Sequence, residues 1–224
     1  MIDVDEFNIR LMKQRELPLA IEWAAREGWN PGLHDAACFY AADPNGFLVG
    51  ELAGEPVGCI SAVRYGSEFG FIGLYIVRPE FRGRGFGIQL WRAAMERLAG
   101  RNVGLDGVVS QQANYAKSGF HLAFRSVRYQ GVVHRAAEND ELPRGVIAAS
   151  AVPFADLAAY DRTIFLASRD QFWKSWLAQP EATSDLSREF EQQAGDGMAH
   201  MLGSLATADL AGGRRLGVAS VVNR

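Results

Sequence analysis

The feature that most constrains the fold is a glycine-rich stretch between an apolar segment and an amphipathic one. Residues 77–87 read Val-Arg-Pro-Glu-Phe-Arg-Gly-Arg-Gly-Phe-Gly. The preceding segment, residues 69–77, is largely apolar and predicts a buried strand. The following segment predicts an amphipathic helix that ends at Gly100, because apolar residues recur in it at helical spacing: Ile88, Trp91, Met95 and Leu98. The chain therefore passes from a strand into a helix through this stretch.

A strand, a glycine-rich turn and a helix start together favour the binding of an anion. The first N–H groups of a helix have no helical partner, the helix dipole attracts negative charge, and glycines let a phosphate approach the backbone. Arg82 and Arg84 can add charge-assisted hydrogen bonds. The alternative interpretation is a tight helix entry that binds nothing.

Two familiar nucleotide-binding motifs do not match the stretch. A P-loop requires Lys-Ser/Thr after its last glycine, and neither pair follows here. The dinucleotide motif Gly-x-Gly-x-x-Gly is replaced by Gly83-x-Gly85-x-Gly87. These mismatches disfavour an ATPase and an NAD-binding protein.

Hydrophobic periodicity and turn signals predict an α/β fold with the element order β-α-α-β-β-β-α-β-α-β. The strands are expected at residues 7–12, 47–52, 57–65, 69–77, 103–109 and 122–133. Short turns join the second, third and fourth of these strands, so we expect an antiparallel meander there.

With its flanking strand and helix, the pattern Val77-x-Pro79-x-x-Arg82-x-x-Gly85-x-Gly87 resembles the acetyl-CoA motif of the GNAT N-acetyltransferase superfamily. The resemblance implies a GNAT-like α/β (α+β) fold, with a mixed, mostly antiparallel central sheet flanked by helices. It also implies acetyl-CoA as cosubstrate: the motif's backbone amides hold the pyrophosphate, and the end of the preceding strand pairs with the pantetheine. The residues it assigns to acetyl-CoA binding are Tyr75, Ile76, Val77, Arg82, Gly83, Arg84, Gly85, Phe86, Gly87 and Ile88.

The family often has a tyrosine four residues before a Gly-Phe pair, where it protonates the departing thiolate. Tyr115 stands at this spacing before Gly119-Phe120, so the resemblance implies a catalytic acid; a half-buried core residue is the alternative. The family often places a general base, a glutamate, on the strand before the motif, but residues 69–77 contain no carboxylate.

The identity of the base is therefore open between Glu68, Asp106, Glu51 and an ordered water. A backbone N–H near Tyr75 or Ile76 is expected to stabilise the oxyanion.

The resemblance in element order covers residues 7–133 and divides the chain. The expected units are a GNAT domain at 1–135, a linker at 136–150 and a partial second domain or helical appendage at 151–224. Within the last unit, helices are expected at 154–160, 168–177 and 198–210 and a strand at 216–222. Residues 104–115 and 160–177 resemble a bacterial GNAT subgroup with a second GNAT-like half. Such a second half would continue with several strands, but from about Glu181 the sequence favours helices and contains few strand patterns. This indicates either a truncated or frame-shifted second half or a natural helical appendage.

Composition disfavours several other classes of protein. The 224 residues carry 23 basic and 26 acidic side chains, a net charge of −3, so no nucleic-acid partner is expected. The apolar runs are far shorter than the roughly 18 residues that span a bilayer, and residues 1–8 do not resemble a signal sequence. We therefore expect a cytoplasmic protein with no membrane partner. Cys38 and Cys59 lack metal-ligand spacing to any histidine, which predicts two buried, reduced thiols and no metal.

The leading hypothesis is transfer of an acetyl group to a primary amine of a small molecule or protein by direct attack, with a homodimer left open. A catalytically impaired, CoA-binding regulatory module is the alternative, and a plain nucleotide-phosphate binder is a third hypothesis. Trp29, His34 and Phe39 are candidates to line the acceptor cleft, although each is also a candidate for core packing.

Overall fold

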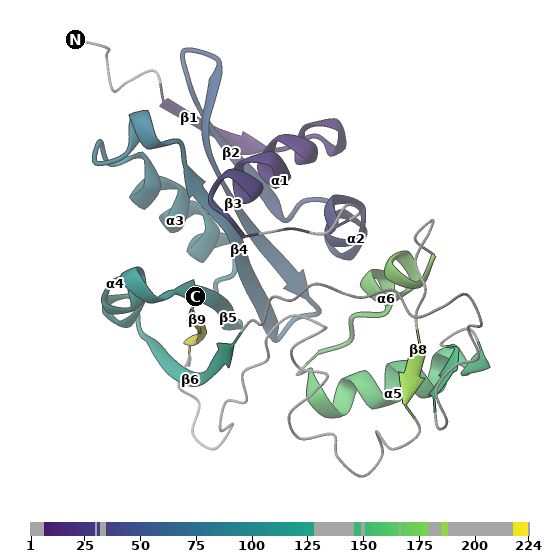
Figure 1. The fold of residues 1–224 in the computed structure, drawn as a ribbon. Coiled ribbons are helices and arrows are strands. Elements are labelled where there is room, and N and C mark those ends of the chain that lie inside the picture. The colour runs from purple at the N-terminus through teal and green to yellow at the C-terminus, as the bar shows by residue number, and fades with distance from the viewer. Residues whose placement is uncertain are drawn as a thin grey trace, which may run out of the picture.

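The computed structural model has the mixed α/β architecture that the sequence predicts (Figure 1). It describes residues 7–29, 31, 35–127, 146–148, 151–165, 167–178, 185–187 and 217–223. Four strands form an antiparallel meander in the order β1-β2-β3-β4, and β5 joins β4 in parallel. Their bounds are Phe7–Leu11 (β1), Phe47–Leu52 (β2), Glu55–Tyr65 (β3), Phe69–Val77 (β4) and Asn102–Val108 (β5).

The sheet continues beyond β5 with two strands from distant parts of the chain. β9 (Gly217–Asn223) pairs in parallel with β5 on one side and with β6 (Phe120–Val127) on the other. The strand expected at 216–222 is therefore confirmed as β9. The strand expected at 122–133 is β6, which begins at Phe120 and is described as far as Val127.

A second, two-stranded sheet pairs β7 (Val146–Ala148) with β8 (Asp185–Ser187) in antiparallel fashion. β7 falls inside the segment expected as a linker. The helix expected at 198–210 lies outside the described residues.

Helices cover both faces of the meander (Figure 1). α1 (Leu17–Arg26) and α2 (Asp35–Ala42) lie on one face, and α3 (Phe86–Arg97) and α4 (Gln112–Lys117) lie on the other. We call these the α1 face and the α3 face. Short 3-10 helices precede α1, the glycine-rich turn and α4, respectively: η2 (Gln14–Glu16), η3 (Pro79–Phe81) and η4 (Val109–Gln111).

Each face of the sheet has its own apolar core, because side chains alternate between the faces along every strand. The core of the α3 face consists of Leu48, Ile60, Ala62, Ile72, Leu90, Trp91, Ala94, Leu98, Val103, Leu105 and Phe120. The core of the α1 face consists of Met12, Leu17, Ala20, Trp23, Ala24, Phe47, Val49, Cys59, Val63 and Ile76. Cys38 and Cys59 are buried, as expected.

The helix after the glycine-rich stretch forms as expected, but its buried stripe differs. Phe86, Leu90 and Ala94 recur every four residues along the buried side, whereas Ile88 is 48% exposed. The expectation that Ile88 begins the apolar face is wrong. Phe86 takes this place because its ring stacks on Phe7 with centroids 4.6 Å apart.

The next two helices, α5 (Phe154–Ile164) and α6 (Asp170–Leu177), pack beside α2 and the start of β4 (Figure 1). Phe172 of α6 stacks on Phe39 of α2 with ring centroids 5.8 Å apart. Phe165, which follows α5, meets Phe69 edge-on with centroids 5.1 Å apart. Aromatic contacts therefore join this segment to the GNAT-like part of the chain.

A buried ion pair holds α5 and α6 to each other. The side chains of Arg169 and Asp161 are 5% and 3% exposed, and the guanidinium makes two hydrogen bonds to the carboxylate. The guanidinium carbon also lies 4.0 Å from the centroid of the Phe165 ring. The Arg169–Asp161 ion pair therefore packs against Phe165, the ring that contacts Phe69 of β4.

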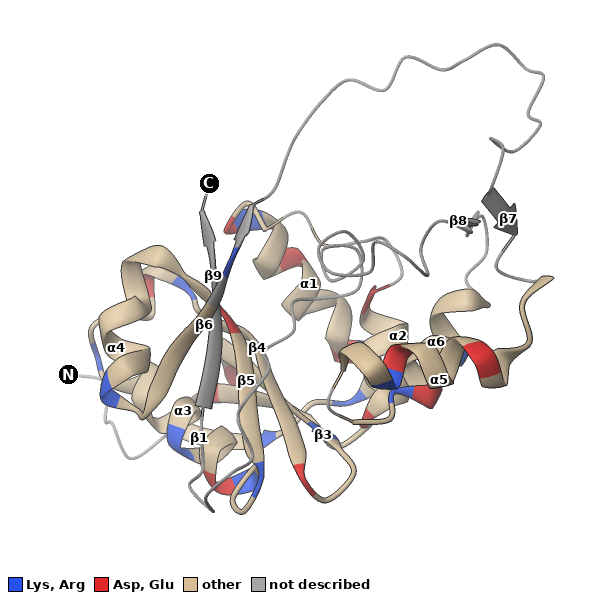
Figure 2. Cartoon of the chain, turned by 90° about the horizontal axis from the view of Figure 1, so that it is seen from below, with Lys and Arg blue, Asp and Glu red and all other residues tan. Residues whose placement is uncertain are grey.

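Charged side chains of both signs are mixed over the described elements (Figure 2). In the part of the chain that the structure describes, no helix is long and apolar enough to cross a membrane.

Candidate active site

The two central strands of the sheet part halfway along their length. β4 and β5 pair over residues 69–72 and 102–105, and their pairing ends there. Beyond this point, β4 continues through residues 73–77 with β3 as its partner among the described strands. One edge of β4 is therefore available to an extended ligand that hydrogen-bonds like an added strand.

A β-bulge in β4 marks the same position. The register between β3 and β4 shifts between Cys59 and Ser61, and β4 has one extra residue there. Leu74 in this bulge has a φ of 45°, a left-handed conformation that costs a non-glycine residue on the order of 1–3 kcal/mol. Its carbonyl oxygen accepts a hydrogen bond from the Cys59 thiol at 3.2 Å. Strain of this kind clusters at binding sites, where the surrounding structure enforces it.

The bulge is accessible to solvent although β4 is a central strand. Ile72 and Ile76 are 3% and 4% exposed, whereas the three residues between them are only partly buried: Gly73, Leu74 and Tyr75. The place where the strands part is therefore an opening in the sheet.

Three aromatic rings pack together beside this opening on the α3 face. The Trp91 ring lies between Tyr75 and Tyr115, with centroid distances of 5.6 Å and 5.9 Å. Tyr115 also lies against Gly107 of β5, where an added Cβ would be 2.5 Å from its ring. Burial raises the pKa of Tyr115, and it raises the pKa of Tyr75 to about 12. Both phenols therefore keep their protons at neutral pH.

The glycine-rich stretch forms the turn into α3. Gly83 and Gly85 have φ values of 74° and 84°, which side-chain-bearing residues rarely adopt, and Gly85 is the N-cap of α3. The amide of Gln89 bonds the Gly85 carbonyl oxygen at 3.4 Å, so the amides of residues 86–88 precede the first helical hydrogen bond. This turn fits an anion held by the backbone.

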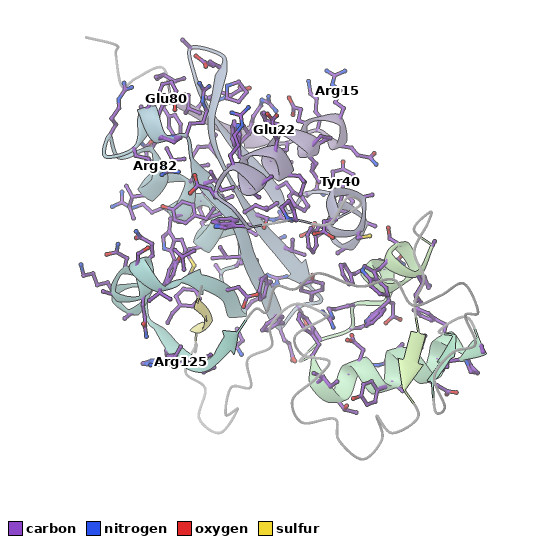
Figure 3. All side chains as sticks on the ribbon, in the orientation of Figure 1. Arg15, Glu22, Tyr40, Glu80, Arg82 and Arg125 are labelled. Atoms are coloured by element: carbon purple, nitrogen blue, oxygen red, sulfur yellow. The ribbon has the colours of Figure 1, made fainter. Side chains whose placement is uncertain are left out.

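The two arginines of the turn have different surroundings. Arg82 lies near the start of α3 (Figure 3). Its guanidinium forms an ion pair with Glu27, the residue after α1, and its Nε donates to the Val77 carbonyl oxygen at 2.7 Å. Arg84 is exposed, and its guanidinium carbon lies 5.0 Å from the centroid of the Phe86 ring. Arg82 therefore ties the turn to α1 and β4, while Arg84 stays accessible to an anion in solvent.

Several other residues of the expected acetyl-CoA site could contribute only their backbone to a ligand. The side chains of Phe86 and Ile76 are buried in separate apolar clusters, so only their backbone can serve a ligand. Gly87 lies beside Tyr75, where an added Cβ would be 2.9 Å from the hydroxyl oxygen. Ile88 is exposed on the first turn of α3.

Two of the three expected acceptor-lining residues are partly buried and pack against apolar clusters. Phe39 stacks on Phe172, and Trp29 packs against the core of the α1 face. His34 lies outside the described residues.

Among the three carboxylates considered as general base, one lies at the opening. Glu51 of β2 forms an ion pair with Arg10 of β1, at the far side of the sheet. Glu68 is exposed in the turn before β4, at the end where β4 and β5 are still paired. Asp106 is the first residue of β5 beyond the paired segment.

One residue of the opening, Gly107, has no motif that marks it in the sequence. It lies against the Tyr115 ring, and Tyr75, which the sequence assigned only to acetyl-CoA binding, joins the same aromatic packing through Trp91. The one available signal for Gly107 is a glycine near the end of a strand that is followed by a short tyrosine-containing helix.

A sheet that parts at its centre beside a glycine-rich helix start defines a class of α/β domain. Residues 15–122 match the model of the acetyltransferase (GNAT) family. A holothin acyltransferase from Pseudoalteromonas sp. (strain SANK 73390) is 32% identical over 202 residues, which are 90% of this chain and 65% of that relative. Together with the fold, these matches show that residues 15–122 form a GNAT acetyltransferase domain.

The solved structure of a putative acetyltransferase from Pyrococcus horikoshii has a similar fold. It superposes with a TM-score of 0.58 at 19% identity and covers 79% of this chain and 63% of that one. An uncharacterised protein of Caenorhabditis elegans is 39% identical over 62 residues, 27% of this chain and 20% of its own length. The chain therefore spans less than two thirds of each of these relatives.

Proposed function

We propose that this protein transfers an acetyl group from acetyl-CoA to a primary amine of a small molecule or protein. The observation that carries the proposal is the convergence of three features on one opening: the parted strands, the glycine-rich start of α3, and Tyr115. The GNAT domain over residues 15–122 supports an acyl-CoA as the acyl donor. The relative named as holothin acyltransferase supports acyl transfer as the reaction.

The geometry of the turn and the strand supports the proposed residues for acetyl-CoA binding. The amides from Gly83 to Ile88 would hold the pyrophosphate, and Arg84 would add positive charge. The free edge of β4 over residues 73–77 would hydrogen-bond the pantetheine arm. The glycines at 83 and 85 are required because side-chain-bearing residues rarely adopt this turn.

In the proposed reaction the amine attacks the thioester directly. A backbone N–H of Tyr75 or Ile76 stabilises the oxyanion, because β4 is no longer paired with β5 beyond Ile72. Tyr115 then protonates the departing thiolate, and the raised pKa keeps its phenol protonated until that step. Holding the two reactants in one opening supplies the remaining rate enhancement through proximity.

Two measurements on the full chain test this function. Calorimetric titration with acetyl-CoA should give saturable heat, and absence of heat at high concentration would refute acetyl-CoA binding. A thiol-release assay should then detect turnover over a panel of alkylamines, arylamines and lysine-containing peptides. Both cysteines are buried, so the protein's own thiols should give little background. Binding without turnover on any amine would refute acetyl transfer and favour a CoA-binding regulatory module.

A further inference from the structure

Three residues from three neighbouring strands form a row across the opening. Ser61 of β3 pairs with Gly73 of β4. The last parallel pair between β4 and β5 is Ile72 with Leu105, so the next residues in register are Gly73 and Asp106. Ser61, Gly73 and Asp106 therefore lie side by side at the level where the strands part.

All three members of the row belong to the α1 face. Cys59 and Val63 pack in the core of that face, so Ser61 between them points the same way. A Cβ added at Gly73 would lie 3.0 Å from the Ser61 hydroxyl oxygen, which puts both on one face. On β5, Gly107 faces the Tyr115 ring on the α3 face, so its neighbour Asp106 points to the opposite face.

The centre of the row has no side chain. Apart from the neighbouring residues 72 and 74, the Ser61 hydroxyl oxygen is the one described atom within 4 Å of where a Cβ at Gly73 would be. Two strand spacings of about 4.8 Å separate the backbones of the outer two residues, which leaves room for an amino group above the glycine. Gly73 is itself partly accessible, whereas Ser61 is 5% exposed.

The opening is thus asymmetric between its two faces. Tyr115, with its proton-bearing phenol, lies on the α3 face, on the same side as the start of α3. Asp106, with its carboxylate, lies on the α1 face at the same level. An acid and a carboxylate on opposite sides of one scissile bond match the two proton transfers that acylation of an amine requires.

From this placement the geometry points to Asp106 as the general base for the proposed acetyl transfer, with the acceptor amine bound over Gly73 between Asp106 and Ser61. The inference rests on the proposed function and adds to it the face from which the acceptor enters. Because β4 contains no carboxylate, the general base is assigned to Asp106 on the adjacent strand β5.

In this reaction the Asp106 carboxylate takes one proton from the acceptor ammonium and later releases it to solvent. The freed nitrogen lone pair forms the C–N bond, and the C–S bond breaks with its electron pair on sulfur. Tyr115 gives its proton to that thiolate and is reprotonated from solvent, while the new amide nitrogen loses its extra proton to solvent. The net products are the amide, CoA thiol and one proton.

The test compares two kinds of acceptor in the full-length protein. Benzylamine is an ammonium at neutral pH and must lose a proton before it attacks, whereas aniline is already uncharged. Asp106→Asn should lower kcat/KM for benzylamine by about a hundredfold and change kcat/KM for aniline far less. The acetyl-CoA affinity of this variant, measured by calorimetry, should match that of the wild type. Glu68→Gln, which removes an exposed carboxylate at the paired end of β4, is the matched control and should leave both acceptors unaffected.

A second variant keeps the inference testable if Asp106→Asn does not bind acetyl-CoA. Gly73→Ala places a methyl group over the row and should lower kcat/KM for the amine by about tenfold or more, with acetyl-CoA affinity retained. Equal losses for benzylamine and aniline in Asp106→Asn would overturn the base assignment, as would unchanged turnover of benzylamine. Unchanged turnover in Gly73→Ala would overturn the acceptor position. A wild type that turns over no amine would instead refute the proposed function itself.

Discussion

Gly107→Ala is expected to displace the Tyr115 ring and so lower turnover, although Tyr115 itself is unchanged. Gly107 is buried on β5, and an added Cβ would lie 2.5 Å and 2.8 Å from two carbons of the Tyr115 ring. Ordinary van der Waals contact begins at 3.4 Å, so the ring must move by about 0.9 Å. Trp91 lies on the α3 side with its centroid 5.9 Å away and restricts the directions of that movement.

The kinetic cost follows from this displacement. A misplacement of about 1 Å in a reacting group can lower turnover by about a hundredfold. We therefore expect kcat of Gly107→Ala to fall by about that factor, while overpacking costs roughly 1–3 kcal/mol of stability. The acetyl-CoA affinity should change little, because the glycine-rich turn and the free edge of β4 are untouched. Thiol release gives kcat, and calorimetry gives the affinity.

Two further variants make this prediction decisive. Tyr115→Phe should slow turnover and leave acetyl-CoA affinity nearly intact, and the double variant with Gly107→Ala should be no slower than the worse single variant. Gly104→Ala is the matched control, because its methyl group would meet Phe69 and Phe71 on the other face at 3.1 Å and 3.3 Å. Wild-type turnover in Gly107→Ala, or additive losses in the double variant, would refute the role of the Tyr115 position.

Three other predictions concern stability. Burial raises the pKa of Cys59 to about 12 from 9.0, so the unfolded thiol ionises first and the free energy of unfolding should fall as pH rises from 9 to 12. Hydrogen bonds from Arg10 lower the pKa of Glu16 to about 2 from 4.5, so stability should also fall as pH drops through this interval. Denaturant titrations at a series of pH values measure both pH dependences. The loss of stability at high pH should be smaller in Cys59→Ala, and the loss at low pH should be smaller in Glu16→Gln. Arg169→Met leaves the Asp161 carboxylate buried and unpaired, so it should cost about 3–5 kcal/mol and expose residues 154–177 to proteolysis.

Each of these stability predictions has a result that contradicts it. If the free energy of unfolding of Cys59→Ala or Glu16→Gln depends on pH as in the wild type, these groups do not control the pH dependence. Resistance of the Arg169→Met segment to protease would show that aromatic contacts alone hold α5 and α6 in place.

The sequence contained the local parts of the site. The turn from β4 into α3 follows from glycines at positions that need positive φ, and the spacing of Tyr115 before Gly119-Phe120 places it on a short helix. These features depend on neighbours in the chain, so a single sequence is sufficient to predict them. The antiparallel meander is predictable for the same reason, because short turns join its strands.

The non-local parts of the site were not predictable in the same way. The bulge in β4 places Leu74 in a left-handed conformation that sequence rules assign to glycine or asparagine. Arg82 reads as a phosphate ligand in the motif, yet its ion pair with Glu27 bridges 55 positions of the chain. The amphipathic pattern of α6 predicts a buried face but does not identify α2 as its partner. Each of these depends on strand register or on packing between distant elements.

The division of chemistry between the two faces explains why glycines recur where side chains would be expected. A strand buried on both faces normally carries large apolar residues. Here Gly107 makes room on the α3 face for the Tyr115 ring, and Gly73 leaves the α1 face clear between Ser61 and Asp106. Since α5 and α6 pack on the elements of the α1 face, changes in residues 154–177 would act on the acceptor side first. In the proposed function, acetyl-CoA binding depends instead on α3 and the turn before it, so we expect that the affinities for the two substrates can be altered separately.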